Sequence, residues 1–291
     1  MKNPEEQSLA YGGQALIEGV MMRSGSHMVM CVRQPDGSIG TSTLNVRPLT
    51  KHPVLGLPFI RGIATLFETM YYGVRSMMNS ASQALGEEDS FTLADYALLV
   101  VMLLVLNGAF IAIPFALTHL LGLTGVVFNL VESAMRLSMF TLYLYLVSRW
   151  GEVARVLQYH GAEHKAINAY EAGAPLDPET VAGYPRLNPR CGTSFLFLTV
   201  LVSVALFSLV PQADYWVRLG YRLALIPVIA SVSYELLRLS DRHRGSPLMR
   251  ALVSPGLLFQ RLTTKEPDRG MIEVAIQALR SVKSLSEADG K

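Results

Sequence analysis

The sequence predicts a mainly α-helical, polytopic membrane protein with about four spans, several amphipathic helices and a small N-terminal antiparallel β element. Apolar residues fill 51% of the 291 positions and only 16% are charged, whereas a water-soluble domain usually carries about 25% charge. Several uncharged runs approach the ~20 residues that a helix needs to cross hydrocarbon. The 25 basic and 23 acidic residues nearly cancel, which excludes the strongly basic surface of a nucleic-acid-binding protein.

Residues 9–50 are expected to form the β element outside the membrane. The segment 9–23 reads as one apolar strand interrupted by glycines, and two further strands are predicted at 27–33 and 39–46. The turn Pro35–Gly37 separates these two, because proline fixes φ and glycine tolerates positive φ. We therefore expect an antiparallel hairpin or a three-stranded meander.

A helix is predicted over residues 54–84. Apolar residues recur there at helical spacing, while Arg61, Glu68 and Arg75 repeat every seven residues on another face. Three charges in one stripe argue against a free span and favour an amphipathic helix that lies on the membrane or on the helix bundle. The acidic stretch 86–90 is expected to end this helix.

Four apolar segments are predicted to cross the membrane. Two of them contain charged residues, as expected in a packed bundle rather than in isolated anchors. Beyond them, Pro255 is expected to break an amphipathic segment, and residues 271–285 have the period of a terminal amphipathic helix. The four predicted spans are 92–121, 124–148, 193–211 and 217–239.

The distribution of basic residues predicts the orientation of the chain. The linkers near 121–125 and 211–216 contain neither Lys nor Arg, whereas the opposite ends of the spans are rich in Arg. The positive-inside rule therefore places both termini and the central loop in the cytoplasm, where both cysteines are expected to be free thiols. The predicted units are a β element (1–50), an amphipathic helix (51–90), a first pair of membrane helices (91–148), a cytoplasmic loop with an HxxEH helix (149–192), a second pair of membrane helices (193–240) and cytoplasmic amphipathic helices (241–291).

The central loop contains the pattern His160, Glu163, His164. On a helix, two histidines four residues apart share a face and can bind one ion, with the glutamate beside them. This order is the reverse of the HExxH zinc motif, in which the glutamate acts as a general base. We therefore predict a divalent metal ion, zinc foremost, with Glu163 as the catalytic base. The alternative is that the three side chains cap or pair on a solvated helix.

A third protein ligand has to come from elsewhere. Glu171 is in phase with the histidines, but it lies roughly 10 Å further along the helix axis, and we expect it to orient a histidine or to bind a neighbouring group. Cys191 and Glu235 are the candidates, at the membrane re-entry and near the end of the last predicted span. The alternatives are that Cys191 is a small buried residue and that Glu235 pairs with Arg238 or Arg190.

Charged residues in apolar surroundings are further candidates. Glu18 lies in an apolar stretch, and a buried carboxylate needs a cation or a functional site; a pair with Arg23 or another arginine is the simpler reading. Glu132 and Arg136 lie four residues apart within a predicted span, close to Asn129. Such charges can line a polar path, and the simpler reading is one ion pair that fixes helix packing.

Four segments of the chain resemble the YqhQ-like family of bacterial membrane proteins. They are YGGQALIEGVMMR, YHGAEHKAINAYE, NPRCGTSFLF and TTKEPDRGMIEVAI, and they occur in the order typical of the family. The resemblance implies a bacterial inner-membrane location and a metal-dependent enzyme without an established substrate. The positions that fall in the motifs of the family include Glu18, Arg23, His160, Glu163, His164, Lys165, Glu171, Arg190, Cys191, Glu266 and Asp268.

These observations support three hypotheses for the function. The first is a metal-dependent hydrolase at the cytoplasmic membrane face, with Lys165 or Arg190 binding an anionic group of a membrane peptide or a lipid head group. The second is a non-enzymatic membrane scaffold or assembly factor, in which the HxxEH helix is a structural clasp. The third is a small transporter or channel that uses Glu132 and Arg136. The lipid bilayer is the expected partner, and no nucleic acid is expected.

Overall fold

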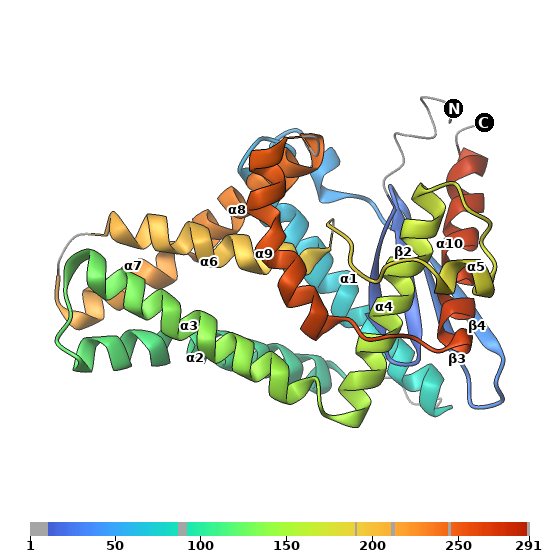
Figure 1. The fold of residues 1–291 in the computed structure, drawn as a ribbon, viewed down its shortest axis with the longest axis horizontal. Helices are drawn as coiled ribbons and strands as arrows, with labels where there is room; N and C mark the ends of the chain where they lie inside the picture. Colours follow the sequence, from blue (N-terminus) through green and yellow to red (C-terminus); the bar gives the residue numbers. More distant parts are fainter. Residues whose placement is uncertain (1–10, 87–91, 190, 211–212, 244–245, 290–291) are drawn as a thin grey trace.

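The computed structural model combines a four-stranded sheet, flanked by helices, with an elongated group of apolar helices (Figure 1). It describes residues 11–86, 92–189, 191–210, 213–243 and 246–289. The strands are β1 (Gly12–Leu16), β2 (Gly19–Ser24), β3 (His27–Arg33) and β4 (Ile39–Asn45), followed by a 3-10 turn, η1 (Leu49–Lys51). The helices are α1 (Ile60–Leu85), α2 (Leu93–Leu120), α3 (Gly125–Val147), α4 (Gly151–Glu171), α5 (Pro178–Ala182), α6 (Gly192–Ser208), α7 (Tyr215–Ala224), α8 (Ile226–Arg242), α9 (Pro247–Thr263) and α10 (Arg269–Asp289).

The sheet is an antiparallel meander in the order β1-β2-β3-β4. The predicted turn at Pro35–Gly37 is present, and Gly37 has a φ of 84°. The segment 9–23 is not a single strand as expected, because β1 and β2 pair with each other around a two-residue turn that includes Glu18. Glu18 has a φ of 52°, a left-handed conformation that is unfavourable for a residue with a side chain.

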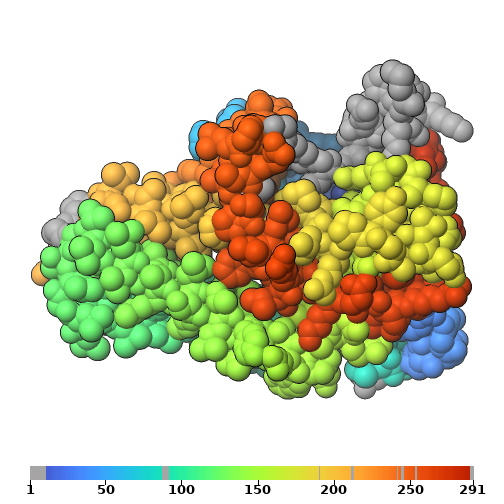
Figure 2. Space-filling view, in the orientation of Figure 1, coloured from blue at the N-terminus to red at the C-terminus, as the bar shows by residue number. Residues whose placement is uncertain are grey.

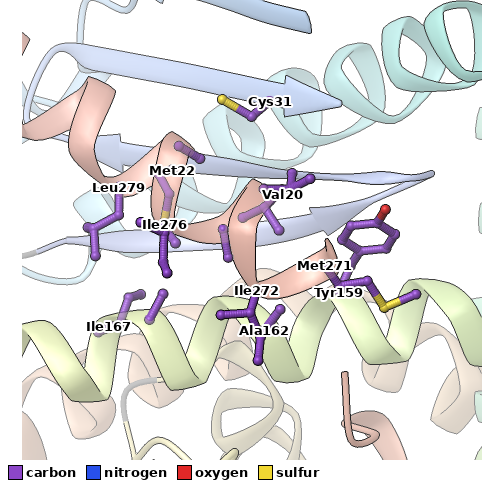
Figure 3. Close-up of a cluster of buried hydrophobic side chains, with 14 of the residues drawn as sticks. Val20, Met22, Cys31, Tyr159, Ala162, Ile167, Met271, Ile272, Ile276 and Leu279 are labelled. Carbon is purple, nitrogen blue, oxygen red and sulfur yellow. The ribbon is translucent and has the colours of Figure 1, made fainter. Parts of the chain in front are cut away.

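Both faces of the sheet are covered by helices. Residues of β2 and β3 alternate between the two faces: Val20 and Met22 pack against α4 and α10, whereas Met21 and Met30 pack on the side of α1. The first of these two cores also contains Ile276 of α10 (Figure 3). Burial on both faces explains why β2 and β3 are almost continuously apolar.

Helix α1 turns two of its three charged residues toward the protein. The carboxylate of Glu68 is buried and paired with Arg23, and Arg61 pairs with Glu235 on α8. Arg75 is exposed, as are the side chains of Phe67 and Tyr71, at 65% and 60%. Glu68 and Arg61 therefore hold α1 against the sheet and α8, and the exposed side of the helix carries large apolar side chains, as on a helix that faces lipid.

Among the described residues, fewer helices could cross a membrane than the four spans predicted. By length and composition α2 and α3 can cross a membrane, and α7 with α8 makes a third span if the pair, bent by 40°, is counted as one. Pro227 lies in the first turn of α8, where it supplies no N–H group to continue helix α7. Helix α6 has 17 residues, or roughly 25 Å at ~1.5 Å per residue, which is short of the ~30 Å hydrocarbon core.

Helix α9 continues through Pro255 instead of breaking there. It packs against α6, and the contact is close because a methyl group added at Gly256 would lie 2.7 Å from the Cα of Ser194. The carbonyl of Ala251, which Pro255 leaves without a backbone donor, accepts a hydrogen bond from the hydroxyl of Ser254 at 3.0 Å.

Candidate metal centre

Helix α4 places the two histidines of the HxxEH pattern side by side. Tyr159, Ala162 and Ala166 recur at helical spacing and bury one face of α4 in the core, which leaves the histidine face toward α9 and the segment 183–191. The imidazole rings of His160 and His164 lie 4.4 Å apart between centroids, at an interplanar angle of 62°. The sequence prediction that these two rings share a face is therefore confirmed.

Backbone carbonyls orient both rings in the same way. The Nδ1 atom of His160 lies 2.7 Å from the carbonyl oxygen of Thr263, and that of His164 lies 2.6 Å from the carbonyl oxygen of Arg186. A carbonyl oxygen can only accept a hydrogen bond, so Nδ1 carries the proton in each ring. The Nε2 atom of each neutral imidazole then presents a lone pair, which is the arrangement found in metal-binding histidines.

Cys191 is brought to the same place. Its Sγ atom lies 3.3 Å from Nε2 of His160, and the ligand atoms of His160, His164 and Cys191 all lie within 4.8 Å of one another. Two ligands bound to one zinc ion at about 2.0–2.3 Å in tetrahedral geometry are separated by about 3.5 Å. Cys191 is also the N-terminal capping residue of α6.

Glu163 lies beside these three residues and is buried. Its Oε2 atom is 3.9 Å from Nε2 of His160 and 3.7 Å from Nε2 of His164, too far for a direct hydrogen bond and close enough for one oxygen atom beside them to contact the carboxylate and a ring nitrogen together. Burial raises the pKa of the Glu163 carboxyl to about 7. A carboxyl with such a pKa can both accept and donate a proton at neutral pH.

A network of amides, which sequence reasoning missed, holds the segment that carries Cys191. The Gln260 amide on α9 accepts from the backbone N–H of Asn188 at 2.9 Å and donates to its carbonyl at 2.7 Å. The Asn168 amide on α4 donates to the carbonyl oxygens of Pro185 and Leu187. Gln260 is fully buried. Its place among apolar residues of a predicted helix could have indicated a buried hydrogen-bonding role, because a buried amide needs partners.

Gly161, between the two histidines, permits close contact with the connection from α9 to α10. A methyl group at this position would lie 2.0 Å from the carbonyl oxygen of Lys265, and the backbone N–H of Lys265 donates to the carbonyl of Leu157 at 2.8 Å. Figure 2 shows this connection, in red, running across the surface beside the segment after α4, in yellow. Thr263, which orients His160, is the last residue of α9 and directly precedes this connection.

Two predicted residues lie outside this cluster. Glu235 accepts hydrogen bonds from Arg61 through Nε (2.7 Å) and Nη2 (2.5 Å), a partner other than the expected Arg238, and it is not among the three clustered ligands. Arg190 itself lies outside the described residues. Glu171 is the last residue of α4, about two turns beyond His164.

The remaining charged residues of the motifs tie segments together. Lys165 is buried; it donates to the carbonyl of Ala182 at 2.7 Å and pairs with Glu266. Glu18 is held by Arg155, in two hydrogen bonds of 2.5 Å each, and by the hydroxyl of Tyr159. The Arg155 guanidinium lowers the pKa of the Glu18 carboxyl. The simpler reading for Glu18, an ion pair, is therefore confirmed with Arg155 as its partner.

The charges predicted within a span form a second buried cluster. Glu132 pairs with Arg136 on the same helix, at 2.5 Å, and with Arg222 on α7. Asn129 accepts from Arg222 at 3.0 Å, and the guanidinium of Arg222 also lies 4.5 Å from the centre of the Phe207 ring. The predicted intrahelical pair is present, and the additional arginine ties α3 to α7.

Comparison with known proteins identifies the family. The family model described as "Protein of unknown function (DUF1385)" matches residues 57–285. The chain is 38% identical over 309 aligned residues to "Uncharacterized protein YqhQ" of Bacillus subtilis (strain 168), covering 97% of this chain and 96% of the relative. No solved structure matches significantly. The chain therefore belongs to the DUF1385 family and is a relative of this YqhQ protein.

Proposed function

We propose that this protein is a metal-dependent hydrolase that acts at the cytoplasmic face of the bacterial inner membrane. The observation that carries the proposal is the convergence of His160, His164 and Cys191, whose ligand atoms lie within 4.8 Å of one another. The two Nδ1–carbonyl hydrogen bonds support it, because they leave both Nε2 atoms available. These three side chains suit zinc, which prefers nitrogen and sulfur ligands. Catalytic zinc sites have three protein ligands, and the fourth coordination position is open to water or substrate.

Glu163 supplies the acid–base chemistry in this proposal. A zinc ion, when bound, lowers the pKa of its water to about 7. The Glu163 carboxylate takes a proton from the attacking water and later gives a proton to the leaving group. The position of its buried carboxylate, 3.9 Å and 3.7 Å from the Nε2 atoms of the two histidines, supports both roles.

The apolar surface supports a membrane substrate. Helices α2 and α3 are long and apolar enough to cross a membrane, and the outward face of α1 carries Phe67 and Tyr71. We propose that the substrate is a lipid head group or a membrane peptide that reaches the centre from the membrane face. We also propose that both termini lie in the cytoplasm, as the positive-inside rule predicts.

Metal content of the detergent-purified full-length protein tests the centre. We expect about one zinc, iron or manganese ion per chain by mass spectrometry in wild type and in His243→Ala, which removes an exposed histidine elsewhere. His164→Ala and Cys191→Ala are expected to lose the ion, while circular dichroism shows that they remain folded. A cysteine nucleophile with His160 as its base would not require His164, so loss of metal in His164→Ala separates the two chemistries.

Glu163→Gln tests the hydrolase assignment separately. This isosteric change is expected to retain the ion and to reduce hydrolysis of phospholipid or peptide substrates by about 10²–10⁴-fold, the usual contribution of a general base. A wild-type protein that stays free of metal after incubation with each ion would exclude the hydrolase and favour the scaffold.

A further inference from the structure

A cavity of about 700 Å³ lies between the sheet and helices α1, α8 and α9. Its walls are formed by strands β1 to β3, by Thr65, Thr69 and Tyr72 of α1, and by residues of α8 and α9. A volume in this range is typical of sites for small ligands. The cavity is separate from the cluster of His160, His164 and Cys191, none of which lines it.

The charged residues that line this cavity are all arginines. They are Arg23, Arg238 and Arg250, and no Asp or Glu is among the lining residues that the structure describes. The charge of Arg23 is neutralised by Glu68. Within the described part of the chain, neither Arg238 nor Arg250 has a hydrogen bond or an ion pair to a carboxylate, because Glu235 is held by Arg61. The charge of Arg238 does act on the nearby Glu235, but it leaves the donors of the Arg238 guanidinium unused by that carboxylate. Both guanidinium groups can therefore donate to an anion, and their planar donors match phosphate oxygens.

The rest of the lining is largely apolar and adaptable. Met21, Met28, Leu237 and Met249 contribute to it, and methionine side chains can fit chains of irregular shape. The wall helices also carry exposed apolar residues on their outer faces, such as Leu248, which is 70% exposed. The cavity combines arginine side chains with an apolar wall, and its helices expose apolar residues. These features suit a ligand that has both an anionic group and a hydrocarbon chain.

One wall of the cavity lies next to the candidate metal centre. Gly13 lines it, and a methyl group at Gly13 would lie 2.9 Å from the Cγ and Oε1 atoms of Glu163. Pro189, two residues before Cys191, lines it as well. Only a glycine backbone therefore separates the cavity from the carboxylate to which we assign proton transfer.

We infer that this cavity binds a phosphate-bearing lipid, with the phosphate at Arg238 and Arg250 and the hydrocarbon along the methionines. Its role as the substrate pocket rests on the proposed hydrolase function, but binding itself requires no metal. Phosphate chemistry alone does not separate a lipid from a soluble phosphate ester, and the experiment therefore compares both sources.

Binding is measured by calorimetry on the detergent-purified full-length protein, stripped of metal with a chelator. The probes are dioctanoyl phosphatidic acid, dioctanoyl phosphatidylcholine, glycerol 3-phosphate and inorganic phosphate. We expect phosphatidic acid to bind at least tenfold more tightly than each of the others. Arg238→Gln and Arg250→Gln are each expected to weaken its binding about tenfold, the usual range for a charge-assisted contact. Arg242→Gln on α8 and Arg261→Gln on α9, which do not line the cavity, serve as matched controls.

Each result has a distinct meaning. Equal binding of glycerol 3-phosphate and phosphatidic acid overturns the lipid assignment and favours a soluble phosphate ester. Equal weakening by the control variants, or unchanged binding in Arg238→Gln and Arg250→Gln, overturns the cavity as the site. His164→Ala is expected to bind phosphatidic acid as wild type does, so that failure of the metal centre and failure of the lipid site are observed separately.

Discussion

The substitution Gly161→Ala tests whether the connection from α9 to α10 shapes the candidate metal centre. A methyl group at Gly161 would lie 2.0 Å from the carbonyl oxygen of Lys265, whereas carbon and oxygen in contact are about 3.3 Å apart. The connection must therefore move by roughly 1.3 Å, or α4 must move away from it. Either shift strains the hydrogen bond from Lys265 to Leu157 and the one between His160 and Thr263.

The expected cost follows from two opposing effects. Overpacking of a tight contact costs about 1–3 kcal/mol, while replacing glycine by alanine inside a helix gains up to about 1 kcal/mol. Gly151→Ala, at the exposed start of α4, meets no atom within 4 Å and serves as the control. We expect Gly161→Ala to be about 1–3 kcal/mol less stable than this control, or roughly 2–10 °C lower in melting temperature.

Thermal unfolding in detergent and titration with zinc measure both consequences. Displacing a group that orients a ligand typically lowers metal affinity by about 10–100-fold, and we expect a loss in this range for Gly161→Ala. Wild-type zinc affinity together with the melting temperature of Gly151→Ala would refute the reasoning, because it would show that the connection yields without moving His160.

Three further predictions follow from the buried polar contacts. Gln260→Met should leave the backbone of Asn188 without its buried partner, cost about 1–3 kcal/mol and weaken zinc binding; unchanged zinc titrations would contradict this. Glu18→Gln should destabilise the protein at pH 7, because Arg155 stabilises only the charged form of Glu18. The difference in unfolding free energy between wild type and variant, measured in urea, should vanish as the pH falls through the lowered pKa of Glu18. A difference that persists at low pH would argue against this pair. Glu132→Gln should lower stability in detergent by about 3–5 kcal/mol, because it leaves buried arginines uncompensated; a loss below about 1 kcal/mol would mean that water or lipid reaches them.

Local geometry explains what could be predicted from the sequence. The shared face of His160 and His164 follows from the helical repeat alone, and the turn at Pro35–Gly37 follows from the backbone preferences of its residues. Cys191 was identified as one of two possible ligands because it lies where the loop returns to the apolar helices. Each of these inferences needed only a short stretch of sequence.

Features that depend on distant partners could not be predicted in the same way. Glu235 looked as suitable a ligand as Cys191, but Arg61, 174 positions away, binds it. The charged stripe of α1 predicted an amphipathic helix, but not that Glu68 would pair with Arg23 of the sheet and Arg61 with Glu235 of α8, while Arg75 stays exposed. Glu18 was expected in a strand because its neighbours are apolar, and the sequence does not show that the chain reverses there. The choice of partner in each case is made by the tertiary fold.

The sheet module has a consequence for the order in which the protein matures. Helix α10 packs on β2 and β3, and Arg33 donates to the carbonyl of Gly270, 237 positions later in the chain, at 2.7 Å. Because synthesis proceeds from the N-terminus, one face of the sheet has no covering helix until α10 has been made. By then α2 and α3 have already been made and can enter the membrane. A chain that stops before α10 therefore keeps the residues of the candidate metal centre but lacks the helix that closes the core beneath α4.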